Sequence, residues 1–336
     1  MTLASTTVQR GEPGADAAGP ATQRGQHLLL SARQFGTVIG LVVLCAILWI
    51  LTPHFLTMSN LLNVAEQTSI NAVVAVGMTF VILSAGIDLS VGSMVALSGV
   101  VLGTALQGGH SLAVALPLSL LTGMACGLGN GALISWGGLP PFIVTLGTMS
   151  IARGAALLFT EGRPVSGFDT SFRVLATGRV GFVPAGVVVM AVVYVVAHFV
   201  LTRTTFGRYV YAIGGNEEAT RLSGVSIRFH KTMIYGVSGL TSAVAAVILT
   251  ARLNSAQPIA GMMYELDAIA ATVIGGTSLM GGDGTLAGTL VGALIMGVLR
   301  NGLNLLGVSS FLQQVVIGGV IVVAVLLDTV LKRNRG

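Results

Sequence analysis

The chain has 336 residues, of which 53% are hydrophobic and only 9% are charged. A soluble domain carries about 25% charged residues, so this composition excludes a soluble protein. It predicts an all-α membrane protein that crosses the lipid bilayer several times. The net charge of +5 indicates basic loops on one side of a membrane, not a nucleic-acid surface. Cys45 and Cys126 lie in apolar runs and predict small core residues, not a disulfide or a metal site.

The apolar pattern divides the chain into a membrane domain and two tails. Residues 1–33, rich in small and polar residues with three arginines, predict a disordered cytoplasmic tail. Residues 34–331 form the predicted membrane domain, and 332–336 form a basic cytoplasmic tail. The apolar runs of this domain are Phe35–Leu51, Gln67–Ala85, Leu89–Leu106, Leu112–Trp136, Phe142–Thr160, Val180–Leu201, Thr232–Arg252, Leu266–Leu279, Thr285–Leu305 and Phe311–Leu331. Most have the roughly 17–25 residues of a spanning helix.

One long polar interruption, residues 202–231, divides the second half of the apolar sequence. It holds five fixed positive charges and two acids, which predicts a cytoplasmic loop. Residues 217–222 can form a short helix, with Asn216 as its N-cap and Gly224 just past its end. Two interpretations stay open: a solvated loop that only sets topology, or a helix that a cytoplasmic partner grips.

The charge pattern also sets the number of crossings. The 202–231 loop and the basic tail 332–336 both belong inside, so an even number of crossings separates them. The short run 266–279, which ends in glycines, must then cross as well. We expect about ten transmembrane helices, some short or broken, with both termini in the cytoplasm. This count puts the loop with Arg163, Arg173 and Arg179 outside, against the charge rule.

Two glycine-interrupted segments, residues 84–92 and 275–284, occupy matching places in the two halves of the apolar sequence. Matching breaks predict two weakly related halves and a pathway near the membrane midplane. Irregular backbone at that depth is tolerated only where protein or a water-filled cavity covers it.

Polar side chains at these breaks and within apolar helices are the candidate pathway or gate residues. They are Asn71, Asp88, Ser90, Asn130, Thr277 and Ser278. Asp88 either caps a helix that begins at Leu89 or lines a gate, and the two roles are compatible. The amides favour packing hydrogen bonds, although a polyhydroxylated ligand needs such groups too. Arg153 and Arg300 lie inside helices or near their ends. Snorkelling to the interface is the ordinary role for both, and we expect it for Arg300.

Glycines recur at every fourth residue in two helices, which predicts faces of close helix contact. They are Gly123 and Gly127 in one helix, and Gly284, Gly288 and Gly292 in another.

The catalytic motifs that we considered are missing from the sequence. Neither Lys231 nor Lys332 follows glycine, so there is no phosphate-binding Gly-Lys-Ser/Thr loop. There is also no metalloprotease motif, no cysteine pair and no nucleophile elbow. An enzyme that works inside the membrane stays an alternative, but nothing in the sequence gathers acids, bases and nucleophiles into a site. We therefore predict no catalytic residue, metal or cofactor in this chain.

Several motifs resemble the permease subunits of ribose-type sugar ATP-binding-cassette importers. They are GMTFVIL at 77–83 with GIDLSVGS at 86–93, PPFIVTLGT at 140–148, IARG at 151–154, GRYVYAIGGN at 207–216 with Ala219 and RLSG at 221–224, and IGGTSL at 274–279 with Gly281, Gly282 and Gly284. The resemblance covers roughly residues 35–331. These motifs are shared by permeases for different pentoses and hexoses, so they do not specify the sugar.

The resemblance implies an importer of several parts in the bacterial inner membrane. Two permease copies would form the pore, a periplasmic sugar-binding protein would deliver the sugar, and a cytoplasmic ATPase would bind ATP and magnesium. It places the ATPase contact at Gly214, Gly215, Asn216, Glu217, Glu218, Ala219, Arg221, Leu222 and Gly224. Nucleotide binding would move these loops and switch the pore between outward and inward access.

An ion-coupled secondary transporter of a small polar solute is the alternative. Such a transporter usually carries several buried acids or histidines. Here Asp88 stands almost alone, with Glu265, Asp267 and Asp283 near helix ends.

Overall fold

The computed structural model describes residues 20–333, and the predicted tails lie outside it at residues 1–19 and 334–336. The helices are α1 (Pro20–Leu51), α2 (Met58–Leu83), α3 (Val91–Gln107), α4 (Leu112–Ser135), α5 (Pro141–Thr160), α6 (Thr170–Thr177), α7 (Ala185–Arg203), α8 (Thr205–Gly215), α9 (Glu217–Leu222), α10 (Ile227–Leu253), α11 (Tyr264–Ile274), α12 (Leu286–Leu305) and α13 (Ser310–Arg333). The strands are β1 (Val165–Ser166), β2 (Arg179–Val180), β3 (Val183–Pro184) and β4 (Ser255–Ala256). Helix α1 begins at Pro20, inside the segment 1–33 that the sequence predicts as a tail.

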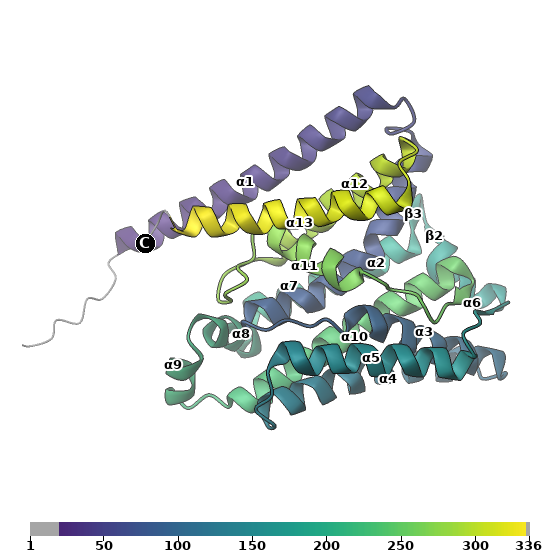
Figure 1. The fold of residues 1–336 in the computed structure, drawn as a ribbon, viewed down its shortest axis with the longest axis horizontal. Coiled ribbons are helices and arrows are strands. Elements are labelled where there is room, and N and C mark those ends of the chain that lie inside the picture. Colours follow the sequence, from purple (N-terminus) through teal and green to yellow (C-terminus); the bar gives the residue numbers. More distant parts are fainter. Residues whose placement is uncertain (1–19, 334–336) are drawn as a thin grey trace, which may run out of the picture.

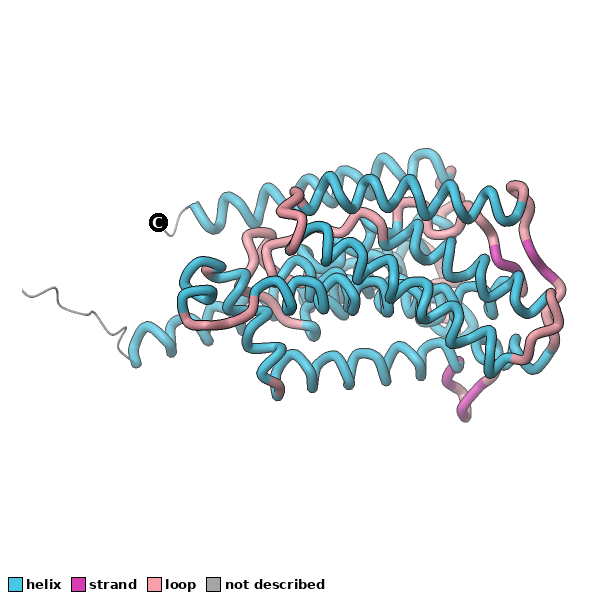
Figure 2. Tube along the Cα trace, turned by 90° about the horizontal axis from the view of Figure 1, so that it is seen from below, coloured by secondary structure: helices cyan, strands magenta, loops and turns pink. Residues whose placement is uncertain are grey.

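The long helices run roughly along one axis, so the bundle has two distinct ends (Figure 1). Helices α8 and α9 lie at one end, together with the start of α1 and the end of α13; we call this the α9 end. Helix α6 and the strands lie at the other, which we call the α6 end, and Figure 2 shows the same separation from below. The strands form two small antiparallel pairs, β1 with β4 and β2 with β3.

Each of the ten predicted apolar runs contains a helix, which confirms a mostly helical, multi-pass membrane protein. Among the described residues, α2, α4, α5, α7, α10 and α12 are long and apolar enough to cross a membrane. Residues 36–51, 91–107 and 310–326 form shorter apolar helices. The added helices α6, α8 and α9 lie between the runs.

Helices α2 and α10 form the centre of the bundle. Every residue of α2 from Ala72 to Leu83 is buried, as expected for a helix that is apolar on all sides. Helix α4 packs on α10 and α3, and α12 packs on α2 and α11. These contacts bury the two central helices between the halves of the chain.

The contact between α4 and α10 brings backbone against backbone. A Cβ atom at Gly127 would overlap the Tyr235 carbonyl, and one at Gly123 would lie 2.5 Å from the Gly239 oxygen. Only glycine permits this approach.

The contact between α12 and α11 uses Gly288 and Gly292 in the same way. A Cβ atom at these positions would overlap the carbonyl oxygens of Gly275 and Ala271. Gly284 behaves differently, because it precedes α12, has a φ of 150° and faces Thr277 of its own loop. The prediction that Gly284 belongs to this helix contact is therefore wrong.

Helix α11 is shorter than the predicted run 266–279. Its 11 residues extend about 16 Å, roughly half of a hydrocarbon core of about 30 Å. The chain continues as the non-helical loop 275–285, in which Gly282 approaches Gly215 of α8. The helix and the loop together reach the α9 end.

Helices α3 and α11 begin beside each other inside the bundle. A Cβ atom at Gly92 would overlap the Gly261 carbonyl and lie 2.6 Å from the Glu265 carboxylate. Gly103, near the end of α3, packs on Ala256 at the α6 end, whereas α11 leads to the α9 end. The two helices therefore run in opposite directions from a shared start.

This arrangement corrects the predicted match between the two breaks. The loops that lead into α3 and α11 are residues 84–90 and 254–263, so these are the equivalent interruptions. Segment 275–284 instead contacts the start of segment 84–92, since a Cβ atom at Gly281 would lie 2.8 Å from Ala85 N. Next to this contact, Gly282 N donates to Leu83 O, at the end of α2, at 2.9 Å. Gly281 and Gly282 permit this close approach to Ala85 and to α8, whereas Gly86 and Gly92 lie against Tyr235 and Gly261.

Replacing Gly288 by leucine tests the α11–α12 contact. We expect a loss of roughly 1–3 kcal/mol or more in stability, because the side chain forces two backbones apart. Thermal unfolding of the purified permease measures the change. Gly147→Leu is the control, because a Cβ at Gly147 meets no atom within 4 Å. Equal stability of the two variants would contradict the assigned contact.

Candidate functional site

The short helix α9 occupies the residues that the sequence predicts, 217–222. The Asn216 side-chain oxygen accepts the Ala219 backbone N–H at 2.9 Å and caps the helix. Gly224, just past the other end, has a φ of +83°, a conformation that favours glycine. Local sequence therefore suffices to start and stop this helix.

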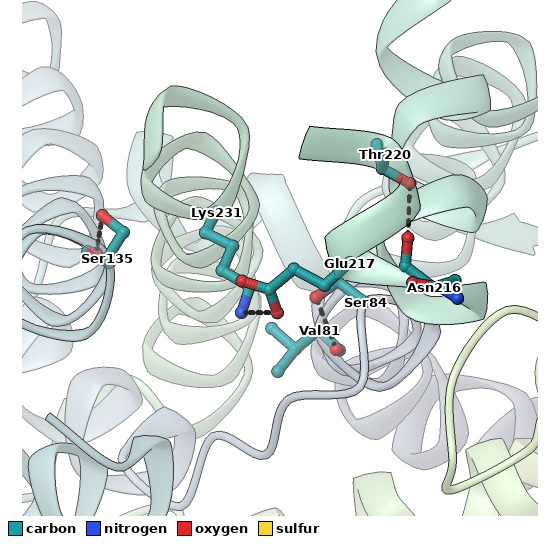
Figure 3. Close-up of polar contacts among 8 residues, drawn as sticks. Val81, Ser84, Ser135, Asn216, Glu217, Thr220 and Lys231 are labelled. Carbon is teal, nitrogen blue, oxygen red and sulfur yellow. Dashed lines mark hydrogen bonds and ion pairs between the residues drawn. The ribbon is translucent and has the colours of Figure 1, made fainter. Parts of the chain in front are cut away.

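An ion pair and one buried side chain hold α9 on the bundle. Lys231 of α10 forms the ion pair with Glu217 at 2.6 Å (Figure 3). Thr220 is buried, and its hydroxyl donates to the Asn216 carbonyl oxygen at 2.7 Å within the first turn of α9 itself. The pair between Glu218 and Arg221 is largely exposed and contributes little to stability.

The opposite face of α9 is open to solvent. Ala219 is exposed, and Leu222 is 78% exposed at the tip of the bundle. These two residues are three apart and share one helical face. A small and a large apolar side chain are thus presented together beside Glu218.

Helix α8 connects α9 to the end of α2 and to the 275–285 loop through close contacts at glycine residues. A Cβ atom at Gly214 would overlap the Leu83 carbonyl and lie 2.6 Å from Gly282 N. A Cβ atom at Gly282 would lie 2.9 Å from the Gly215 Cα. The C-terminal end of α8, the end of α2 and the 275–285 loop therefore meet through their backbones. We call Leu83, Gly214, Gly215 and Gly282 the glycine junction.

A tyrosine adds a side-chain bond next to the glycine junction. The Tyr211 hydroxyl donates to the Gly284 carbonyl oxygen at 2.8 Å. Burial, with the nearby Asp283 carboxylate, raises the pKa of Tyr211 to about 12. The hydroxyl consequently stays protonated and keeps donating at neutral pH.

Asp88 is fully buried and surrounded by hydroxyl groups. Its Oδ1 accepts the Ser90 N–H at 3.0 Å and the Ser90 hydroxyl at 2.6 Å. Its Oδ2 accepts the Ser238 hydroxyl of α10 at 2.8 Å. Asp88 thus fixes the turn that leads into α3, which begins at Val91 instead of Leu89. A role in a gate stays a prediction.

The hydrogen bonds continue from Ser90 across the bundle. The Asn130 amide of α4 donates to the Ser90 hydroxyl at 2.9 Å, and Thr148 of α5 donates to the Asn130 oxygen at 2.5 Å. Asp88, Ser90 and Asn130 therefore belong to one packed polar network that ties α3, α4, α5 and α10 together.

A charged pair joins α12 to α11, and the sequence analysis named both of its residues without pairing them. Arg300 Nη2 donates to Asp267 Oδ2 at 2.7 Å and to Oδ1 at 2.9 Å. Asn71 of α2 donates to Asp267 Oδ2 at 3.3 Å. The expected snorkelling of Arg300 is wrong, because an ion pair holds it. Two opposite charges in apolar runs would have suggested this pair.

Arg153 does not snorkel either. Its Nη1 donates to the carbonyl oxygens of Pro258 and Ala260 at 2.7 Å each. These bonds hold the 254–263 loop, which has little secondary structure of its own, against α5.

Thr277 and Ser278 shape the 275–285 loop. Thr277 is fully buried and lies against Gly284, and Ser278 N donates to the Asp283 carbonyl at 2.8 Å. Among the predicted pathway residues, the structure thus groups Asp88, Ser90 and Asn130 in one network and places the others elsewhere.

Comparison with known proteins assigns the family. The model for the permease component of branched-chain amino acid transport systems matches residues 60–325. The chain is 47% identical over 313 residues to the ribose import permease protein of Haemophilus influenzae, covering 92% of this chain and 96% of that protein. It is 49% identical over 298 residues to the Bacillus subtilis ribose import permease protein, with coverages of 88% and 92%. It is 40% identical over 302 residues to the Escherichia coli D-allose transport system permease protein, with coverages of 89% and 93%. No solved structure matches the chain.

The chain therefore belongs to this family of transport-system permease components. It is a multi-pass protein of the bacterial inner membrane and a transport subunit. The predicted resemblance to sugar-importer permeases is confirmed.

Truncating Asp88 tests the polar network. Asp88→Ala removes the acceptor of three hydrogen bonds, and each donor left unpaired costs about 1–3 kcal/mol. Asp88→Asn keeps an acceptor for Ser90, and Ser238 can accept as well as donate, so its loss should be smaller. Thermal unfolding of the purified variants gives the order. If the two variants are equally stable, the carboxylate does not organise these groups.

Proposed function

We propose that this chain is the transmembrane subunit of an ATP-binding-cassette importer that carries ribose or a related monosaccharide across the inner membrane. The observation that carries the proposal is an identity of 47–49% to ribose import permeases over about nine-tenths of the chain. The similarity to an allose permease supports the sugar class. Transport proceeds by alternating access, with the energy supplied by a separate ATPase.

The partners follow from this role. A cytoplasmic ATPase binds ATP and magnesium, a periplasmic protein delivers the sugar, and a second permease copy completes the pore. The exposed Ala219 and Leu222 on α9 support a docking face for the ATPase. The chain itself needs no cofactor and performs no catalysis.

Ten crossings with both termini in the cytoplasm fit this role. The start of α1 and the end of α13 lie at the α9 end in Figures 1 and 2, which supports the proposed topology. Helix α11 and the 275–285 loop together make one crossing. The tail 1–33, the membrane domain 34–331 and the tail 332–336 remain the proposed divisions.

The glycine junction supplies a route for coupling. Because α8 meets both the end of α2 and the 275–285 loop through backbone atoms, a displacement of α9 and α8 displaces both segments. Packed interfaces of this kind switch between discrete arrangements instead of deforming gradually. The ATPase state and the pore state then share a coupling free energy.

The ion-coupled alternative fits the buried charges less well. Asp88 accepts three hydrogen bonds from the chain, and Asp267 is held by Arg300 and Asn71. These groups are already partnered within the bundle. Relatives named as import permeases favour the ATP-driven function as well.

Reconstitution decides between the two mechanisms. Proteoliposomes containing the permease, its ATPase and its binding protein should accumulate ribose, or a related monosaccharide such as allose, only with ATP and magnesium. Uptake driven by an ion gradient without the ATPase would overturn the proposal in favour of the ion-coupled transporter.

Substituting Ala219 by arginine tests the ATPase contact. The change places a charge where a small side chain is expected to be buried in an interface, at a cost of several kcal/mol or with loss of the contact. We expect normal membrane insertion, loss of ATPase co-purification and loss of sugar uptake. The control Thr202→Arg adds the same charge to an exposed position at the same end, outside α9.

The comparison between these variants is decisive for α9. Normal ATPase retention and uptake in Ala219→Arg would return the 202–231 loop to a purely topological role. Equal loss in Thr202→Arg would show that added charge anywhere at this end disrupts assembly, and would also reject the assignment.

Cysteine labelling tests the topology. In a variant with Cys45 and Cys126 replaced by alanine, Ser223→Cys should react with an impermeant maleimide only after the cells are opened. Ser171→Cys, exposed on α6 at the other end, should react in intact cells. Labelling of Ser223→Cys from outside would reverse the proposed orientation.

A further inference from the structure

A cavity of about 440 Å³ lies between α11, α12 and α13. Asp267 and Arg300 form one wall, Asn304, Gln313 and Gln314 lie towards the α6 end, and Met262 and Met263 border it on the side of the 254–263 loop. Its volume falls within the range of about 300–1,000 Å³ that small-molecule sites occupy.

The polar groups of this cavity stand on helices that are otherwise apolar. Asn304 and Gln314 are exposed, and the Arg300 side chain is 36% exposed. Charged and amide groups facing hydrocarbon are costly, so such residues normally face a water-filled space. This face of α12 and α13 therefore borders a watery cavity, not lipid.

The hydrogen bonds already made leave several donors available. Arg300 uses Nη2 for Asp267, and among the described residues no acceptor bonds Nη1 or Nε. Asn304 Oδ1 accepts the Gln313 amide at 2.8 Å, which leaves its own NH₂ group available to the cavity. No hydrogen bond joins the Gln314 amide to another described side chain or backbone group.

The paired charges of Arg300 and Asp267 indicate which class of ligand the cavity suits. Asp267 neutralises Arg300, so the cavity as a whole favours no anion. Guanidinium and amide N–H groups beside an amide oxygen suit vicinal hydroxyls, and the two methionines offer an apolar surface to the carbon face of a ring. A neutral polyhydroxylated solute fits this combination.

We propose that this cavity is a transient monosaccharide site on the translocation path. Arg300, Asn304 and Gln314 hydrogen-bond the sugar hydroxyls, and Asp267 is a positioning residue that orients Arg300. The assignment rests on the proposed sugar-importing function and adds the residues that hold the sugar inside the permease.

A second cavity of about 490 Å³ continues this path. It lies on the α5 side and shares Met262 and Met263 with the first cavity. Helices α5 and α13 cross the same face of the bundle in Figure 1. Arg153, which holds the intervening loop by its carbonyl groups, also lines this second cavity.

Ligand protection of single cysteines tests the site on the permease alone. In the variant without Cys45 and Cys126, Gln314→Cys is treated with a maleimide in the presence and absence of D-ribose or D-allose. At three times the dissociation constant, sugar should slow modification about fourfold by occupying the site. Val315 is the next residue in the sequence, lies outside the cavity lining and is 69% exposed. Val315→Cys should therefore react at the same rate with and without sugar.

Three results would overturn the site. Equal rates for Gln314→Cys with and without either sugar mean that the cavity binds no sugar. Equal slowing at Val315→Cys means an effect on the whole protein. A cysteine at position 314 that never reacts means that another helix closes the cavity in the assembled permease.

Transport by the complete complex provides the second measurement. Asn304→Leu and Gln314→Leu each remove hydrogen bonds to the sugar, so uptake at saturating binding protein should fall about five- to tenfold. Val315→Leu should transport normally, and all three should retain the ATPase. Arg300 is left in place, since its removal would strand the buried Asp267 carboxylate.

The two measurements separate this site from the proposed function. A wild-type complex without ATP-driven sugar uptake contradicts the function, whatever the cysteines show. A wild-type complex that transports, with normal uptake in both leucine variants and no protection of Gln314→Cys, contradicts only the site.

Discussion

The whole arrangement depends on covering irregular backbone inside a membrane bundle. Hydrocarbon offers no hydrogen bonds, so every exposed N–H and C=O at that depth must find a partner in the protein or in enclosed water. Three loops interrupt the helices, residues 84–90, 254–263 and 275–285. Gly282 N bonds Leu83 O, Asp88 accepts the Ser90 N–H, and Arg153 bonds two carbonyls of the middle loop. The close glycine contacts of α4 with α10 and of α12 with α11 bring the helices around these loops close together.

The same requirement links the exposed end of the bundle to its interior. A side chain at Gly214 would separate α8 from the end of α2 and from the 275–285 loop, so nothing compressible lies between them. The exposed face of α9 is thereby connected to both segments.

Buried charges divide the interior into two parts of different character. Around Asp88 the partners are hydroxyl and amide groups on four packed helices, and this network is closed. Around Asp267 the partners are Arg300 and Asn71, and Arg300 lines a cavity bordered by further amides. The first group organises the helix breaks, whereas the second leaves hydrogen-bonding capacity for a solute. The distinction depends on which donors are already satisfied, not on the number of charges.

The sequence by itself determined the features that local chemistry controls. Hydrophobic length predicted a helix in each of the ten apolar runs, and the Asn216 cap with Gly224 fixed both ends of α9, since capping involves neighbours three or four positions apart. Tertiary structure alone decided that 84–90 corresponds to 254–263, that Arg300 pairs with an acid 33 residues away, and that Arg153 holds carbonyls more than 100 residues away. The hydrophobic pattern of the sequence does not predict such partners, because it shows that a polar residue lies in an apolar helix but not which distant residue packs against it.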